Sequence, residues 1–436
     1  MKNKINPEKN KTSNLQHSQE IPNQKSAKII VIGASHAGIS FCDQLRKKGY
    51  KGELTIIEKR RGAPMERPPL SKAFLLEPDD DIKPVYLLKR AKWYKEQAVT
   101  LRHGNAVNKI DPYSRTVTLD NNDVLDFDLI VIATGAIPRN LEDAEGISKS
   151  FVLRQPDDAI KIRHTARGMK SATIIGGGYI GLELAATLRQ MGLEISVIEV
   201  AERLLARVAS PPIARIMTEL HLKHGVSIYT GISVQQLHHQ DSAYCGITLS
   251  DDKRVESDML IVGIGVAPDS ALAVEAGIET ESHGSGAILV DDSMQTNIPN
   301  VFAIGDVALK RGSSVRIESV HNAQDSATRA VSAIMGTKPP AYEAPRFWSD
   351  QYDANLQSVG IVPMEIEEVY QIVRPGSREG GESFWSYHKK QLLAVETIRD
   401  IENFMLGARC LNNNISPDPD LIGDPNYNPM SSAGPV

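Results

Sequence analysis

Two short glycine turns, each between an apolar run and an amphipathic segment, constrain the fold of this chain more than any other feature of its sequence. The better defined turn runs from Gly176 to Gly181, includes Gly178, and has the spacing G-x-G-x-x-G. A strand-like run, 172–175, precedes it, and a segment with helical periodicity, 179–191, follows it. Such a turn directs backbone N–H groups and the positive end of the helix dipole toward a diphosphate. The pattern predicts a dinucleotide-binding β-α-β unit.

An acidic residue follows this turn at the spacing expected for a ribose contact. Glu199 ends the next strand-like run, 195–198, about 20 residues beyond the turn. The extra phosphate of NADPH would lie beside its carboxylate, and two unit charges about 4 Å apart repel by about 4 kcal/mol at an effective dielectric of about 20. We therefore expect NADH as the preferred nucleotide. The alternative is that Glu199 turns away and is a solvated strand end.

The first turn, from Gly33 to Gly38, is a weaker match because Ser35 occupies the position of the second glycine. The turn separates the apolar run 28–32 from the helical segment 36–48, and Glu58 supplies the acid after the next strand. Alone, this spacing is at least as typical of an ordinary strand-helix turn as of a dinucleotide-binding turn. A second unit on the same chain favours dinucleotide binding, so the sequence predicts an α/β protein with two Rossmann-like dinucleotide-binding domains.

Length and charge narrow the class of protein. A chain of 436 residues fits two or three domains. The formal net charge of −5 argues against binding to nucleic acid, and the sequence has no apolar run long enough for a signal peptide or a membrane span. We expect a cytoplasmic protein with a disordered polar tail at 1–26 and a second, frayed tail at 412–436.

The cysteines do not suggest a disulfide framework or a metal site. Cys42, Cys245 and Cys410 are an odd number without a C-x-x-C spacing, so we expect three core residues and no bound iron-sulfur cluster or zinc. The histidine pairs at 221 and 224 and at 238 and 239 have no third ligand nearby and are expected on the surface.

Several motifs together resemble a known family, the oxygenase-coupled NADH-dependent ferredoxin reductases. They are Glu66-Arg67-Pro68-Pro69-Leu70-Ser71-Lys72, the second glycine turn with its continuation Leu182-Glu183-Leu184-Ala185-Ala186, Arg316-Ile317-Glu318-Ser319-Val320, and Phe347-Trp348-Ser349-Asp350-Gln351-Tyr352. The resemblance spans about residues 28–411. It implies a glutathione-reductase-like fold with a small α+β C-terminal domain, bound FAD, and electron delivery from NADH to a two-iron two-sulfur ferredoxin that serves a Rieske dioxygenase or a haem monooxygenase.

The resemblance also implies domain limits and cofactor contacts. The FAD-binding domain would be discontinuous, at 27–143 and 269–338, with the NAD-binding domain at 144–268 and the C-terminal domain at 339–411. The implied FAD contacts are Gly33, Ser35, Ala37, Gly38, Glu58, Arg67, Lys72, Val107, Arg154, Asp306 and Val320. The implied NADH contacts are Gly176, Gly178, Ile180, Gly181, Glu183, Glu199, Arg207, Gly263 and Glu318. Arg203 is expected to be a structural cation or one that lies behind the residues in contact with the nucleotide.

Three residues are implied in catalysis. A carboxylate at Glu183, between Leu182 and Leu184, needs a partner if it is buried. The resemblance supplies Lys72, so we expect an ion pair beside the flavin. Trp348 is placed at the wall of the flavin site that faces the ferredoxin, whereas Trp385 is expected in the core.

Two other functions share parts of this pattern. A flavin disulfide reductase would need a redox cysteine in the segment 67–75, which has none. A signalling flavoprotein similar to apoptosis-inducing factor would share Lys72 and Glu183, but its long C-terminal insertion and basic surface are not evident. The expected partner is a ferredoxin, without nucleic acid or membrane, on a monomer or weak homodimer.

Overall fold

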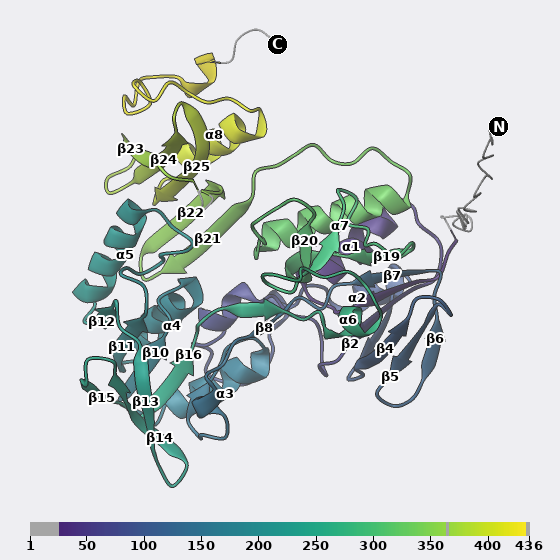
Figure 1. Cartoon of the computed structure of the whole chain (residues 1–436), viewed down its shortest axis with the longest axis horizontal. Helices are drawn as coiled ribbons and strands as arrows, with labels where there is room; N and C mark the ends of the chain where they lie inside the picture. Colours follow the sequence, from purple (N-terminus) through teal and green to yellow (C-terminus); the bar gives the residue numbers. More distant parts are fainter. Residues whose placement is uncertain (1–25, 363–365, 433–436) are drawn as a thin grey trace, which may run out of the picture.

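The computed structural model describes residues 26–362 and 366–432, and three five-stranded sheets organise them (Figure 1). We call the parts built on these sheets the first nucleotide unit, the second nucleotide unit and the C-terminal unit. The sheets of both nucleotide units are parallel, and that of the C-terminal unit is antiparallel. The architecture is the predicted one, two Rossmann-like units with a small α+β unit. The expected disordered tail, 1–26, lies almost entirely outside the described residues.

The first nucleotide unit has the strand order β19-β7-β1-β2-β3. Its central strands consist almost entirely of Ile, Val and Leu because a parallel sheet covered on both faces buries every side chain. Helices α1 and α7 pack together on one face, and a three-stranded antiparallel sheet, β4-β5-β6, completes the unit (Figure 1). The elements are β1 Ile29–Ile32, α1 His36–Lys47, β2 Leu54–Glu58, α2 Ala91–Glu96, β3 Thr100–His103, β4 Val107–Asp111, β5 Thr116–Leu119, β6 Val124–Asp126, β7 Leu129–Ile132, α6 Ala271–Glu275, β18 Ile288–Val290, β19 Val301–Ala303, β20 Ala308–Lys310 and α7 Val320–Ile334.

The second nucleotide unit repeats this plan with the order β12-β11-β10-β16-β9. Helix α4 follows β10 after the second glycine turn, as predicted, and its apolar side chains are buried except for Tyr179 and Ile180 in the first turn of the helix. The elements are β9 Ser150–Phe151, α3 Pro156–Ala166, β10 Ser171–Ile175, α4 Tyr179–Gln190, β11 Glu194–Glu199, α5 Pro211–Lys223, β12 Ser227–Thr230, β13 Val234–Gln240, β14 Ala243–Leu249, β15 Arg254–Glu256 and β16 Met259–Val262.

A two-stranded ribbon connects the two nucleotide units. Strand β8 (Ala136–Pro138) leads out of the first unit, and β17 (Val266–Pro268) leads back, so that the chain later adds β19 to the first sheet. The two connections pair antiparallel, with Pro138 opposite Val266. The second nucleotide unit is therefore inserted within the first.

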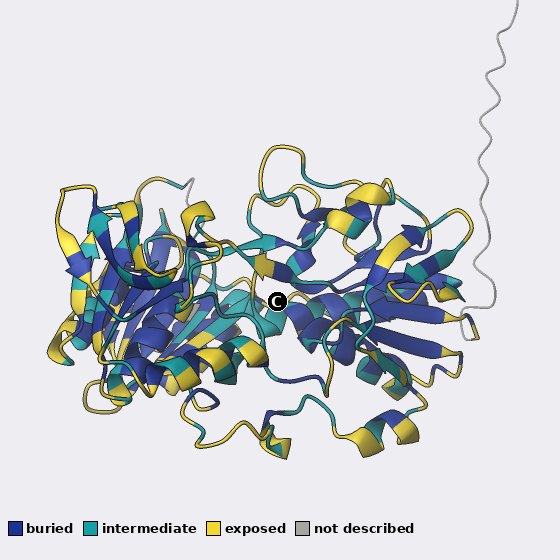
Figure 2. Cartoon of the chain, turned by 90° about the horizontal axis from the view of Figure 1, so that it is seen from below, coloured by how far each residue is buried: buried dark blue, intermediate teal, exposed yellow. Residues whose placement is uncertain are grey.

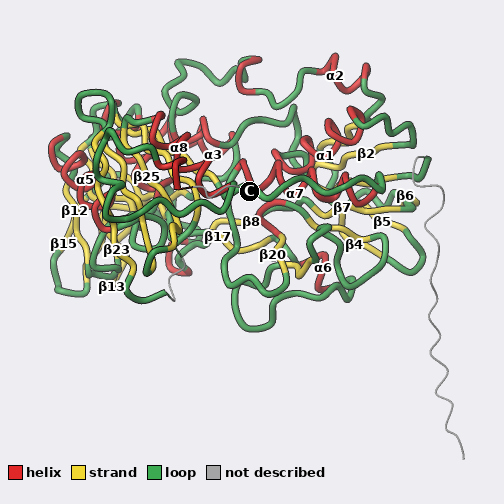
Figure 3. The backbone as a smooth tube through the Cα atoms, turned by 90° about the horizontal axis from the view of Figure 1, so that it is seen from above, coloured by secondary structure: helices red, strands yellow, loops and turns green. Residues whose placement is uncertain are grey.

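The C-terminal unit lies beside the second nucleotide unit, next to α5 (Figures 1 and 3). Its strand order is β21-β22-β25-β24-β23, and α8 covers β22 and β25. Trp385 of β24 is fully buried, which confirms its expected place in the core. The elements are β21 Arg346–Gln351, β22 Ala354–Gly360, β23 Val369–Pro375, β24 Glu382–His388, β25 Gln391–Ile398 and α8 Ile401–Asn412.

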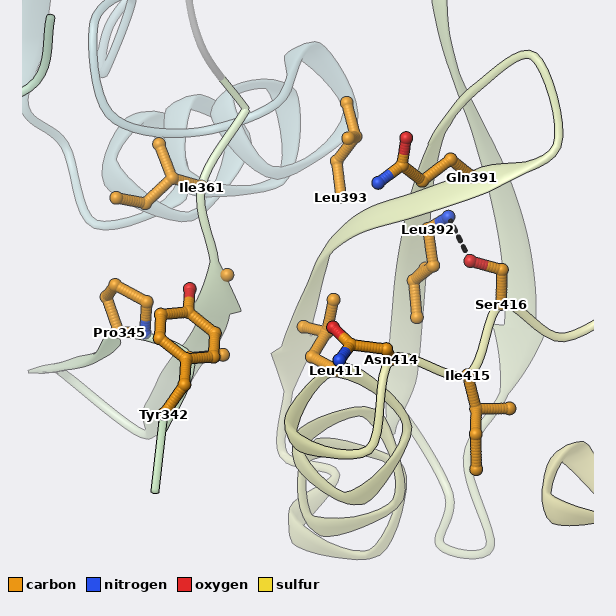
Figure 4. Close-up of a pocket in the computed structure, with 12 residues that line it drawn as sticks. Tyr342, Pro345, Ile361, Gln391, Leu392, Leu393, Leu411, Asn414, Ile415 and Ser416 are labelled. Carbon is orange, nitrogen blue, oxygen red and sulfur yellow. Dashed lines mark hydrogen bonds between the residues drawn. The ribbon is translucent and has the colours of Figure 1, made fainter. Parts of the chain in front are cut away.

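The expectation of a frayed tail from residue 412 is wrong for the described residues. The backbone of 422–427 is tied down by Arg374, whose guanidinium donates to the carbonyls of Ile422, Asp424, Pro425 and Tyr427. Just after α8, the chain turns back onto β25, where the Ser416 hydroxyl accepts from the Leu392 N–H beside a cavity of about 260 Å³ (Figure 4). A polar composition predicted disorder, but a buried arginine satisfies these carbonyls.

Burial follows the sheets. Figure 2 shows buried residues on the strands and on the inward faces of the helices in both halves of the molecule, with exposed residues on loops and outer faces. None of the helices in the described ranges is long and apolar enough to cross a membrane. Within the same ranges, no group of three or more His, Cys, Asp or Glu residues could hold a metal ion.

Candidate functional site

The second glycine turn packs its backbone directly against the end of β16. Gly176 has φ +110, and a Cβ there would lie 2.3 Å from the carbonyl oxygen of Gly263. The carboxylate of Glu199 accepts from the Gly177 N–H at 2.7 Å and from the Ala201 N–H at 2.8 Å. The acid is therefore fixed at the turn rather than pointing away as a solvated strand end.

A cavity of about 490 Å³ opens between this turn and the loop after β11. Gly178 begins α4 without a side-chain cap, and a Cβ built on it meets no atom within 4 Å, so the free N–H groups of the helix face open space. Five of the nine predicted NADH contacts line this cavity, whereas Ile180, Gly181, Glu183 and Glu318 lie outside its lining. Among its lining residues are Gly176, Gly177, Gly178, Glu199, Arg207 and Gly263.

Arg203 does not belong to this lining. Its guanidinium donates to the carbonyls of Leu204, Leu205 and Ala206 in its own loop. These contacts agree with a structural role for this cation.

The first glycine turn has the same construction. Gly33 has φ +103, and a Cβ on Gly38 would lie 2.0 Å from the Gly33 carbonyl oxygen. Ser35 is the N-cap of α1 but makes no capping hydrogen bond, so its hydroxyl leaves the helix N–H groups available. Glu58 accepts from the N–H groups of Ala34 at 3.0 Å and Arg60 at 2.9 Å, as Glu199 does in the other unit. A second dinucleotide fits this cradle.

Cations gather beyond the first turn. Arg154 forms an ion pair with Asp306 at 3.4 Å, and Arg67 donates to the Arg154 carbonyl. Burial and the neighbouring Arg154 guanidinium lower the pKa of Arg67 to about 10. Close to the turn, a Cβ on Gly305 would lie 2.8 Å from the Ala37 Cβ. Two close arginines suit the diphosphate of a bound dinucleotide.

The remaining predicted FAD contacts lie in the first nucleotide unit. Val107 begins β4 and is buried in the core, and Val320 is the first residue of α7. Glu318 forms an ion pair with Arg316, whose guanidinium also donates to the Asp306 carbonyl at 2.7 Å. Glu318 also interacts electrostatically with Asp306 and with Arg207 of the NADH cavity, so it lies between the two predicted cofactor sites.

The predicted ion pair between Lys72 and Glu183 is confirmed, with 2.7 Å between Nζ and Oε1. Glu183 is buried on α4, and Lys72 lies just after a short 3-10 helix, Pro68–Ser71. Two hydroxyls also donate to the carboxylate, Ser71 to Oε2 and Ser349 to Oε1 at 2.6 Å. These donors come from the first nucleotide unit and the C-terminal unit, so all three units meet at Glu183. A buried carboxylate with three donors is fully compensated.

An ordered chain of hydrogen bonds extends from Ser349 to α5. The Gln351 amide N–H donates to the Ser349 hydroxyl at 3.1 Å, and the Gln351 amide oxygen accepts from His221 Nε2 at 2.8 Å. His221 is fully buried, so the expectation of a surface histidine is wrong here. The ring of His224 stacks on Tyr352 with centroids 3.7 Å apart. The partners of these histidines are on β21 and in the turn after it, which cover the end of α5.

Trp348 lies on β21 next to Ser349 and is 36% exposed. Its neighbour Phe347 stacks on Tyr179 of the second glycine turn, with ring centroids 4.3 Å apart. An indole that keeps a third of its surface accessible is compatible with a docking wall, and this role stays a prediction.

Sequence reasoning missed the side chains that hold Glu183. Ser71 and Ser349 both lie within motifs that carry the resemblance, at 66–72 and 347–352, and Gln351 lies in the second of these. Their positions next to Lys72 and Trp348 in the sequence were the only indication that these side chains belong to the site. Their role depends on contacts between residues 112 and 166 positions apart.

Residues 27–327 match the family described as pyridine nucleotide-disulphide oxidoreductase. The chain belongs to this family. Residues 346–431 match a second description, reductase C-terminal, which includes most of the segment after α8. The chain is therefore an oxidoreductase of the pyridine nucleotide-disulphide oxidoreductase family with an additional C-terminal reductase unit.

Similar proteins include reductase components of oxygenase systems. The ferredoxin–NAD(+) reductase component of the p-cumate 2,3-dioxygenase system of Pseudomonas putida is 34% identical over 406 residues, which cover 92% of this chain and 96% of that protein. The ferredoxin reductase for the CYP199A2 system of Rhodopseudomonas palustris superposes with a TM-score of 0.87 at 31% identity, covering 93% of this chain and 100% of that one. Putidaredoxin reductase in its covalent complex with putidaredoxin gives 0.85 at 30% identity, covering 93% and 98%.

The two dinucleotide sites fit the cofactors of this oxidoreductase family, FAD and NAD(H). The first turn and the arginines beyond it have hydrogen-bond donors that suit the diphosphate of FAD, and Glu58 has acceptor oxygens. The second turn, with Glu199 and Arg207, lines the open cavity that an exchangeable nucleotide requires. Lys72 and Glu183 lie where the two nucleotide units meet.

Proposed function

We propose that this oxidoreductase is an NADH-dependent ferredoxin reductase, which passes electrons from NADH through FAD to a two-iron two-sulfur ferredoxin that feeds an oxygenase. The relatives support this proposal, because they are named as reductases of a dioxygenase system and of a CYP199A2 system. The putidaredoxin complex supports a protein as electron acceptor. We further propose that the enzyme acts as a monomer or weak homodimer.

One observation carries the proposal. A disulfide reductase needs a redox cysteine in the segment 67–75, and in this chain that segment has no cysteine and carries Lys72, which pairs with Glu183. Its three cysteines are elsewhere: Cys42 on α1, Cys245 on β14 and Cys410 on α8. Burial raises the pKa of Cys42 to about 12 and that of Cys410 to about 11, so both are thiols near neutral pH. Without an internal disulfide, electrons must leave to an external acceptor.

The residues then have separate tasks. Glu199 and the second turn bind the adenosine side of NADH, and Arg207 supplies a cation at the cavity for its diphosphate. Glu183, held by three donors, fixes the Lys72 ammonium where the nucleotide units meet. Bound FAD supplies the conversion between a two-electron donor and one-electron acceptors. One NADH and two oxidised ferredoxins give NAD⁺, two reduced ferredoxins and one proton.

The test is NADH-dependent reduction of cytochrome c, with and without an added two-iron two-sulfur ferredoxin. We expect rapid reduction only when ferredoxin is present. A variant with Cys42, Cys245 and Cys410 all changed to Ala should keep this activity. Loss of turnover in a folded, flavin-loaded triple variant, or ferredoxin-independent reduction at the same rate, would contradict the proposal. Gel filtration over a range of concentrations tests the oligomeric state.

A further inference from the structure

The loop between β11 and α5, residues 200–209, forms one wall of the NADH cavity. Val200, Ala201, Leu205, Ala206, Arg207 and Val208 all line it. The loop has no regular secondary structure, so its position depends on its contacts with the rest of the molecule. Near its middle, the Leu205 N–H donates to the Gly177 carbonyl at 2.9 Å, which ties the loop to the glycine turn.

The far end of the loop is held by another part of the molecule. At Ser210, the N-cap of α5, the backbone N–H donates to both carboxylate oxygens of Glu396, at 3.1 and 3.2 Å. The Ser210 hydroxyl makes no capping hydrogen bond, and Pro211 and Pro212 have no N–H to offer. Glu396 therefore provides the negative group that a helix N-terminus favours.

Glu396 belongs to β25, in the middle of the C-terminal sheet, and is only 5% exposed. Burial raises the pKa of its carboxyl group, and the hydrogen bonds from Ser210 and the Arg203 guanidinium oppose this rise. A buried acid costs free energy unless it is compensated. Neither the dinucleotide-binding turns nor the Lys72–Glu183 pair makes use of it.

The same unit also contacts the other end of α5, where Gln351 accepts from His221. The C-terminal unit thus holds α5 at both ends, and the loop with Arg207 leads directly into this helix. A shift at Ser210 would move one wall of the cavity relative to the glycine turn. The loop would then be tied to this turn by the Leu205 N–H and by the Tyr179 hydroxyl, which donates to the Val208 carbonyl at 3.4 Å.

We propose that Glu396 is a positioning residue for NADH: it holds the Ser210 end of the 200–209 loop and thereby sets the cavity wall that carries Arg207. The inference deepens the proposed function and rests on it. The C-terminal unit then contributes to nucleotide affinity as well as to the Glu183 site, although it contains no dinucleotide-binding turn.

The test compares Glu396→Ala and Glu396→Gln with Glu382→Ala, a control on the exposed surface of the same sheet. The dissociation constant for NAD⁺ is measured by calorimetry, KM and kcat for NADH are measured with ferricyanide as acceptor, and amide hydrogen exchange is followed in 200–210. For Glu396→Ala we expect KM and the dissociation constant to rise about tenfold, the effect of losing one charge-assisted hydrogen bond, with kcat changed less than about twofold. Glu396→Gln, which keeps an acceptor oxygen, should lie between the wild type and Glu396→Ala.

Faster exchange in 200–210 should accompany the weaker binding. Unchanged nucleotide binding in a folded Glu396→Ala or Glu396→Gln protein, or a fall in kcat with unchanged KM, would overturn the positioning role. Failure of the wild-type enzyme to bind NAD⁺ or oxidise NADH would instead overturn the proposed function. The Gln variant keeps the side-chain volume, so the test remains decisive if the Ala variant does not fold.

Discussion

The carboxylate of Glu199 should determine the preference for NADH over NADPH. Both of its oxygens are fixed by backbone N–H groups, at 2.7 and 2.8 Å, so it cannot swing away from a nucleotide bound at the turn. At a separation of about 4 Å and an effective dielectric of about 20, each unit of phosphate charge is repelled by about 4 kcal/mol, about three decades in affinity. Because Glu199 is only half-buried, screening by salt reduces this to about two decades at physiological ionic strength.

The perturbation is Glu199→Gln, and the measurement is kcat/KM for NADH and for NADPH with ferricyanide as acceptor. We expect the wild-type enzyme to favour NADH and the variant to lose about 100-fold of that ratio. The amide also disturbs the contacts with Gly177 and Ala201, which weakens both nucleotides alike and cancels in the ratio.

The matched control is Glu58→Gln, which changes the equivalent carboxylate in the first nucleotide unit. It should alter flavin retention and leave the nucleotide ratio unchanged. A wild-type preference for NADPH, or a ratio that Glu199→Gln does not change, would refute the electrostatic reasoning.

Three further predictions concern the two turns, the ion pair and the buried histidine. Gly178→Ala should leave the flavin content intact and weaken NAD⁺ binding about tenfold, because its Cβ enters the open space at the helix N-terminus. Gly38→Ala should lose flavin, because its Cβ would lie 2.0 Å from a carbonyl oxygen. Equal flavin content in the two variants would contradict this prediction. Lys72→Met should slow flavin reduction by NADH about 10- to 100-fold in stopped-flow measurements, because it removes a charge-assisted hydrogen bond and leaves Glu183 without its cation. An unchanged rate would show that the Lys72–Glu183 pair has no part in the mechanism. Burial lowers the pKa of His221 below 6.5, so the unfolded chain binds more protons than the folded chain, and stability is lost as pH falls below 6.5 toward the folded-state pKa. The Tm of His221→Gln should therefore fall less than that of the wild type across this pH range. Parallel Tm profiles of the two proteins would contradict a lowered pKa at His221.

The parts of the fold that depend on local spacing could be predicted from the sequence. A strand, a glycine turn and a helix must follow one another directly to bind a diphosphate, so both turns and the α/β class were predicted correctly. Glu58 and Glu199 were found because the acid follows at a nearly constant spacing. The Lys72–Glu183 pair is different, because its members are far apart in the sequence and only the family resemblance joined them.

The remainder depends on how the units pack together. Glu396 and Ser210 are 186 positions apart, and no local pattern connects a mid-strand glutamate with a helix N-cap. His221 lies on a helix whose exposed face could not be distinguished from the face that β21 covers. The carbonyls after residue 421 are ordered by one distant arginine, Arg374, which composition does not reveal.

The paired connections β8 and β17 make the second nucleotide unit exchangeable as a cassette. Pro138 and Val266 are opposite each other on adjacent strands, about 5 Å apart, so a foreign nucleotide-binding unit joined at these two residues would need no added linker. Cofactor preference could then be transplanted in one step without altering the first sheet. The C-terminal unit limits which foreign nucleotide-binding units are compatible. A grafted unit must still present a free N–H to Glu396 and a ring nitrogen to Gln351.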